Sequence, residues 1–147
     1  MHVTAPGISA RDTIPCPSIV SWNVTSQCSL HCPHFYLDAG RSRRDELSTA
    51  EGKSLIDSLV HAGTRLLILS GGEPLKRMDI FEFIHYGREK GLRVAMGTSG
   101  VILDRKTARL LGDAGISSVA ISLDSLIPAV HDRFRGLTGA WQKAPVP

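Results

Sequence analysis

Two cysteines four positions apart, Cys28 and Cys32, are the residues of this chain best suited to bind a metal. They stand in a polar segment that follows an apolar run and precedes a basic loop. A loop can wrap so that both sulfurs point inward, and two thiolates at this spacing can then reach one metal centre. The alternative is a pair of unrelated reduced cysteines, one of them in the core.

Histidines in the same segment offer a second ligand set. Cys28, His31, Cys32 and His34 are residues of the types that bind zinc. Four ligands within seven residues would, however, strain a tetrahedral site. The remaining cysteine, Cys16, lies apart from this segment. Three cysteines do not make a disulfide framework in a chain of this size, and they fit a reducing compartment.

Composition indicates a globular protein with one core. The 147 residues are 42% hydrophobic, which is typical of a single soluble domain. Seventeen Lys and Arg against fourteen Asp and Glu give a net charge of +3, and the only basic run, residues 41–44, is short. We therefore expect no nucleic-acid partner. Because there is no signal-peptide core and no apolar run near membrane-spanning length, we expect a cytoplasmic protein without a membrane partner.

Strand and helix signals alternate along the chain. Residues 1–17, with three prolines, are predicted to form an irregular lead-in, and residues 18–147 the core domain. The predicted strands are residues 18–24, 65–70, 92–96 and 116–123. The predicted helices run from Ser48 to Gly63, from Asp79 to Gly91, from Asp104 to Gly115 and from Pro128 to Trp141. The second strand is apolar nearly throughout, which predicts that both of its faces are covered.

This alternation predicts an α/β fold with parallel strands joined by right-handed crossovers, either in a barrel or in an open sheet. Both architectures place their sites at the carboxyl ends of the strands. The cysteines follow the first predicted strand, residues 71–74 (GGEP) the second, residues 98–100 (TSG) the third and residues 122–124 (SLD) the fourth. Four such features at one edge predict a binding site there.

In this order the motifs resemble those of the radical S-adenosylmethionine (SAM) enzymes. Cys28-x3-Cys32-x2-Phe35 is similar to the CxxxCxxC loop of that family, with Phe35 in place of the third cysteine. Residues 71–74 resemble its glycine-rich SAM motif, and the resemblance covers roughly residues 18–141.

Within the family, the most similar members modify tetrapyrroles. They are the haem d1 biosynthesis proteins and the related didecarboxysirohaem deacetylases, and the likeness rests on residues 22–23, 38–40, 122–125 and 131–141. Peptide-modifying maturases share many of these features and remain an alternative. The resemblance therefore implies a small-molecule substrate, with a tetrapyrrole as the suspected class.

The resemblance implies a partial (β/α) barrel of the radical SAM type, with about four strand–helix units of the usual six. It also implies two cofactors, SAM and a [4Fe–4S] cluster, and an electron donor such as ferredoxin or flavodoxin. In this family three thiolates bind three of the irons, and the fourth iron chelates SAM. The reduced cluster then cleaves SAM to a 5′-deoxyadenosyl radical, which abstracts hydrogen from the substrate.

Site residues follow from the same resemblance, with Cys28 and Cys32 as metal ligands. The implied SAM-binding residues are Gly71, Gly72 and Glu73 along the methionyl group, Ser122 and Asp124 at the ribose, Thr98 and Ser99 in the pocket wall, and Arg135 at a carboxylate. Glu73 would accept a hydrogen bond from the amino group of SAM. Structural alternatives remain: GGEP as a turn, Asp124 as a helix cap and Arg135 as a solvated helix residue.

Phe35 is the main departure from the family pattern, because its side chain has no donor atom. Cys16 precedes the first strand, so at ~3.3 Å per residue its sulfur should lie roughly 20 Å away at the opposite edge of the sheet. His34 is adjacent, and imidazole does ligate some iron–sulfur clusters, but a neighbouring loop position points elsewhere. We therefore expect no stable, reducible [4Fe–4S] cluster in this chain.

The length is a second departure, because the sequence stops with the fourth of the six strand–helix units that are usual in the family. We expect a missing C-terminal part, and a fourth strand whose outer edge is unpaired. The alternative function is therefore a non-catalytic SAM-binding remnant or fragment.

Overall fold

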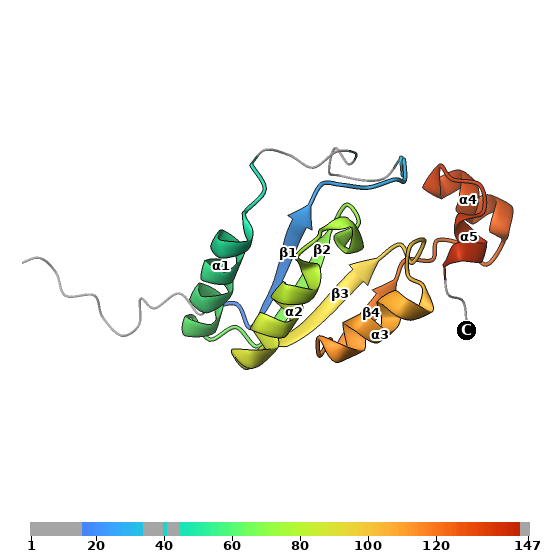
Figure 1. The fold of residues 1–147 in the computed structure, drawn as a ribbon. Helices are drawn as coiled ribbons and strands as arrows, with labels where there is room; N and C mark the ends of the chain where they lie inside the picture. The colour runs from blue at the N-terminus through green and yellow to red at the C-terminus, as the bar shows by residue number, and fades with distance from the viewer. Residues whose placement is uncertain (1–15, 34–39, 41–44, 145–147) are drawn as a thin grey trace, which may run out of the picture.

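The computed structural model describes residues 16–33, 40 and 45–144. Four parallel strands form one sheet in the order β1-β2-β3-β4 (Figure 1). The strands are β1 (Ile19–Thr25), β2 (Leu66–Gly71), β3 (Arg93–Thr98) and β4 (Ser118–Ile121). The predicted alternation of strands and helices is confirmed, although β4 is shorter than the predicted strand.

Helices connect successive strands and cover one face of the sheet (Figure 1). They are α1 (Thr49–His61), α2 (Ile80–Glu89) and α3 (Arg105–Asp113), with a single 3-10 turn, η1 (Pro74–Lys76), between β2 and α2. α1 begins at the predicted capping box, in which Ser48 and Glu51 each accept a backbone N–H of the other. α3 begins where the Asp104 carboxylate accepts the N–H of Thr107.

The core lies between the sheet and these three helices. Alternate strand residues enter it, and Leu67, Leu69 and Val94 are fully buried. They pack in one cluster with Ile56 of α1, Phe83 and Ile84 of α2, and Leu111 of α3. The residues between them in β2 and β3 are half-buried or exposed, because no described helix covers the second face. The prediction that the second strand is covered on both faces was therefore wrong.

The fourth predicted helix is two helices in the structure, α4 (Pro128–Arg135) and α5 (Ala140–Lys143). Gly136 follows α4 with φ +66°, a left-handed conformation that ends a helix and favours glycine. The carboxylate of Asp132 then accepts the N–H groups of Gly139 and Trp141, at 2.6 and 2.9 Å, and so fixes the corner before α5. The continuous helix predicted from Pro128 to Trp141 was therefore wrong.

Among the described residues, β4 pairs only with β3, so its outer edge is unpaired as predicted. Beyond it, the segment leading into α4 exposes large apolar side chains, with Leu126 and Ile127 at 79% and 61% exposure. In the part of the chain that the structure describes, no helix is both long enough and apolar enough to cross a membrane.

Candidate functional site

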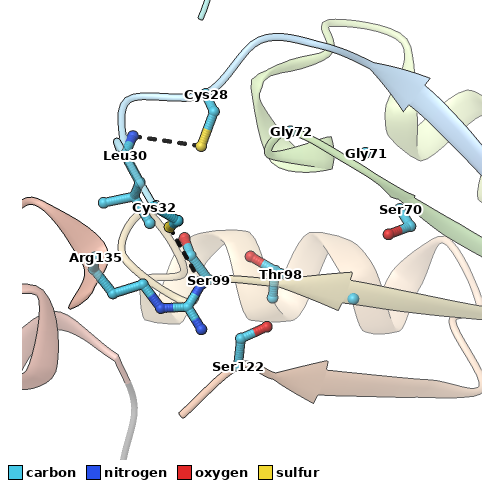
Figure 2. Close-up of a pocket in the computed structure, with 11 residues that line it drawn as sticks. Cys28, Leu30, Cys32, Ser70, Gly71, Gly72, Thr98, Ser99, Ser122 and Arg135 are labelled. Atoms are coloured by element: carbon cyan, nitrogen blue, oxygen red, sulfur yellow. Dashed lines mark hydrogen bonds between the residues drawn. The ribbon is translucent and has the colours of Figure 1, made fainter. Parts of the chain in front are cut away.

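A hollow lies at the carboxyl edge of the sheet, between the cysteine segment and the tips of β2, β3 and β4 (Figure 2). Its lining residues are Cys28, Leu30, Cys32, Ser70, Gly71, Gly72, Gly97, Thr98, Ser99, Ser122 and Arg135. The cavity has a volume of about 110 Å³ and opens to solvent on one side.

All but two of the residues predicted for the site line this hollow. The exceptions are Glu73 and Asp124, and each contacts residues that do line it. The parallel sheet brings the group together, because every strand ends at the same edge. Sequence reasoning missed Leu30, Ser70 and Gly97. The last two sit beside predicted motifs, and the two-residue period of a strand could have placed them on the face without helices.

Gly71 and Gly72 are required by backbone packing. A Cβ on Gly71 would lie 2.4 Å from the Thr25 carbonyl oxygen, and one on Gly72 would lie 2.3 Å from that of Gln27. The backbone N–H of Gly72 donates to Thr25 at 2.7 Å. The tip of β2 therefore lies directly against the chain that leads to Cys28. Backbone packing therefore accounts for the presence of both glycines. The close approach of a ligand, which the resemblance implied, is not needed to explain them.

Glu73 is buried at 2% exposure, and its carboxylate connects the tips of two strands. One oxygen accepts the hydroxyl of Thr98 at 2.7 Å, and the other accepts the N–H and the hydroxyl of Ser99, at 3.0 and 2.5 Å. The N–H of Leu75 donates to the first oxygen as well, at 3.3 Å. The carboxylate therefore faces the β3 tip and supports the wall of the hollow from behind.

The two cysteine sulfurs face the hollow from one segment (Figure 2). Both cysteines are half-buried and reduced. Cys28 Sγ accepts the N–H of Leu30 at 3.4 Å, and Cys32 Sγ lies 3.7 Å from a guanidinium nitrogen of Arg135. Burial raises the pKa of the Cys28 thiol, and the negative charges of Glu73 and Cys32 add to this rise, while the Leu30 N–H opposes it.

Arg135 reaches the hollow from α4 and is buried at 7% exposure. Its Nε lies 2.6 Å from Asp124 Oδ2, so the guanidinium joins an acidic residue to a cysteine sulfur. His131, at 1% exposure, packs beside this pair and accepts the N–H of Asp124 through Nδ1 at 3.3 Å. The reading of Arg135 as a solvated helix residue was therefore wrong, and so was that of Asp124 as a helix cap, since α4 has no side-chain cap.

The described residues supply two thiolates for a cluster that takes three in the family pattern. Phe35 and His34 lie outside the described residues. Cys16 is exposed and precedes the amino end of β1, whereas the hollow lies at the carboxyl ends of the strands. In the described part of the chain, no three His, Cys, Asp or Glu side chains are grouped to hold a metal ion, which leaves the zinc alternative without support there. Within residues 16–33, 40 and 45–144, the three-thiolate set is therefore not met.

Comparison with known proteins gives a consistent family match. The sequence model described as "Radical SAM superfamily" matches residues 22–144. The chain is 44% identical to the Fe-coproporphyrin III synthase of Methanosarcina barkeri, over 86% of this chain and 32% of that protein. It is 39% identical to the AdoMet-dependent heme synthase of the same organism, over 86% and 37%. It is 37% identical to the pre-heme d1 synthase of Dinoroseobacter shibae, over 97% and 35%.

The chain thus spans about a third of the length of these curated relatives. Among solved structures, SuiB of Streptococcus suis bound to S-adenosylmethionine superposes with a TM-score of 0.75 at 19% identity, over 87% of this chain and 30% of that one. A likeness at this identity concerns the fold alone. It confirms the predicted partial (β/α) barrel.

Proposed function

The chain belongs to the radical SAM superfamily, and from that premise we propose that the hollow at its strand tips binds SAM. The family implies SAM and a [4Fe–4S] cluster as cofactors. One observation carries the proposal: three strand tips, the cysteine segment and a buried arginine all meet at one hollow. Its lining offers side-chain hydroxyl groups, backbone polar groups and one cation. Hydroxyl and backbone groups suit a ribose, and the cation suits a carboxylate.

Within that proposal, Arg135 is the partner of the SAM carboxylate, because it is the cation in the lining of the hollow. Ser122 lines the hollow and is the proposed partner of the ribose hydroxyls, with Asp124 beside it. Thr98 and Ser99 form the wall. Glu73 supports that wall, since its two oxygens already accept donors from β3. Gly71 and Gly72 bring this wall against the cysteine segment.

We propose a tetrapyrrole as the substrate class, which the names of the three relatives support. The open face of the sheet agrees with a bulky substrate, because Ser70 and Gly97 place little side-chain volume beside the hollow. A peptide substrate is the less favoured alternative, because peptide-modifying relatives match this chain at 33–34% identity, below the three relatives named above. A cytoplasmic location and an electron donor such as ferredoxin or flavodoxin belong to the same proposal, and the reduced cysteines agree with it.

A second candidate function, a SAM-binding module without radical chemistry, is favoured by one observation. The cluster that supplies the electron in this family takes three thiolates, and Cys28 and Cys32 are the two that line the hollow. We therefore propose that this chain, as its sequence stands, binds SAM without cleaving it.

Calorimetric titration of the folded chain with SAM tests the proposed site. The Gly97→Leu variant should lose SAM binding, because a side chain at Gly97 enters the hollow, where the nearest atom is Ser70 Oγ at 4.0 Å. Gly112→Ala is the control, since Gly112 lies in α3 with open space around its Cβ position. A folded wild-type chain that shows no heat of SAM binding, or a Gly97→Leu variant that binds SAM as the wild type does, would overturn the proposal.

A further inference from the structure

The connection from Ser26 to Ser48 carries both cysteines, and its two ends meet beside the end of β1. Glu46, near the second end, accepts the N–H of Ser26 at 2.8 Å and the Ser26 hydroxyl at 3.0 Å. The hydroxyl of Thr25 donates to both oxygens of the same carboxylate, at 3.0 and 3.1 Å. We propose that Glu46 is a positioning residue of the cysteine site: it fixes the backbone immediately before Cys28.

A short path of hydrogen bonds leads from this carboxylate to the first cysteine. The carbonyl of Ser26 accepts the N–H of Gly40 at 3.0 Å, and the carbonyl of Gly40 accepts the N–H of Cys28 at 3.1 Å. The Thr25 hydroxyl also accepts the N–H of Gln27 at 3.0 Å. Glu46 therefore anchors Thr25 and Ser26. Ser26 in turn binds Gly40, and Gly40 binds the backbone N–H of Cys28.

The opposite side of the same backbone is held by the GGEP turn that follows β2. The N–H of Glu73 donates to the carbonyl of Gln27 at 2.6 Å. Residues 25–28 thus lie between the Glu46 carboxylate and the GGEP turn. This arrangement sets where the Cys28 sulfur enters the hollow relative to the strand tips.

Arg77 joins the same two chain ends from the core side. Its guanidinium donates to the carbonyl of Val24 at 2.7 Å and to that of Leu47 at 2.6 Å, and it pairs with Asp79 at 2.6 Å. It also stacks 4.8 Å from the centre of the Phe83 ring, inside the core. Because Arg77 closes the base of the connection independently, loss of the Glu46 carboxylate should loosen the cysteine segment while the core stays intact.

This inference deepens the proposed function and rests on it, since the cysteine segment forms one wall of the proposed SAM hollow. The test measures thiol reactivity without SAM or metal. Folded protein carrying Cys16→Ser is labelled with 5,5′-dithiobis(2-nitrobenzoate), so that Cys28 and Cys32 are the reacting thiols. The loss of a hydrogen-bonded carboxylate anchor shifts a local opening equilibrium about tenfold or more, so Glu46→Ala should accelerate labelling by that factor.

Glu51→Ala is the matched control. It removes the same type of side chain five positions along the sequence, where the Glu51 carboxylate is part of the capping box of α1. We expect a lower urea midpoint for this variant and an unchanged rate of thiol labelling. Glu46→Gln keeps an acceptor for the Ser26 N–H and should label at an intermediate rate. Thr25→Val should resemble Glu46→Ala, and the double variant should add little to either.

Labelling that rises in both Glu46→Ala and Glu51→Ala in proportion to their loss of global stability would overturn the inference, because Glu46 would then act on stability alone. An unchanged rate in Glu46→Gln and Thr25→Val would overturn it as well. Failure of SAM binding in the calorimetric titration would count against the proposed function and would leave the labelling result standing.

Discussion

The hydroxyl of Thr98 donates to Glu73 Oε1 across 2.7 Å, and this contact joins the tip of β3 to the tip of β2. Ser99 gives the other oxygen of Glu73 two further donors. Because Glu73 is almost fully buried, these donors replace the water that the carboxylate would otherwise bind. The wall of the hollow therefore depends on a carboxylate that reaches across from the neighbouring strand.

Thr98→Val should destabilise the chain by about 1–3 kcal/mol, because it keeps the shape of the side chain and leaves a buried carboxylate short of a donor. It also removes the acceptor of the Gly100 N–H. Urea denaturation measures the loss, with Thr138→Val at an exposed corner as the control. Equal unfolding free energies in the two variants would contradict the role given to this contact.

Gly72→Ala should lower the free energy of unfolding by about 1–3 kcal/mol or more, because the new Cβ would lie 2.3 Å from a backbone oxygen of Gln27 that cannot easily move. Gly112→Ala is the opposite case. Gly112 lies in α3 with nothing near its Cβ position, so alanine should stabilise the helix by about 0.5–1 kcal/mol. Thermal or urea unfolding of both variants gives the comparison, and the same sign in both would contradict the packing argument.

The fold could be predicted where its signals are local. The capping box at Ser48 and the cap at Asp104 stand in the sequence next to the helices they start. The break at Gly136 was missed because it depends on the Asp132 carboxylate, which reaches forward to Gly139 and stabilises a corner in place of another helical turn.

The site could be predicted as a group of residues but not as a set of contacts. Parallel strands must end at one edge, so the motifs had to meet there. Which atoms meet is decided by contacts across the sheet, such as Glu73 with Thr98, twenty-five positions apart. Glu46 was missed for the same reason, since its partner Ser26 is twenty positions away.

The reactivity of Cys28 with iodoacetamide should rise at a higher pH than that of a cysteine in a short unstructured peptide. Only the thiolate reacts, and burial raises the pKa of the Cys28 thiol. The pKa of this thiol is therefore higher in the folded chain than in the unfolded chain. The neutral thiol stabilises the fold at pH values below its unfolded pKa, and this stabilisation is lost as the pH rises toward the folded pKa. Mass spectrometry of modified Cys28 and of the modified reference peptide between pH 7 and pH 10 checks the order, and coincident midpoints would contradict it.

Arg135→Lys should weaken SAM binding about tenfold. The planar guanidinium of arginine can pair with Asp124 and bind a second carboxylate at the same time, whereas the ammonium group of lysine keeps the charge but cannot make both contacts. Arg133→Lys on the same helix is the control, since Arg133 is exposed and outside the hollow. Calorimetry with SAM compares the two, and an equal effect in both variants would contradict the role proposed for Arg135.

The central claim is that this chain retains a SAM hollow and lacks one cluster ligand. Anaerobic reconstitution with iron and sulfide, followed by electron paramagnetic resonance of the reduced protein with and without SAM, tests that claim most directly. The wild-type chain should fall short of four irons and show no SAM-dependent shift. Phe35→Cys should gain both properties, and Phe35→Ser should gain neither. Four irons per wild-type chain with a signal that SAM shifts would contradict the account.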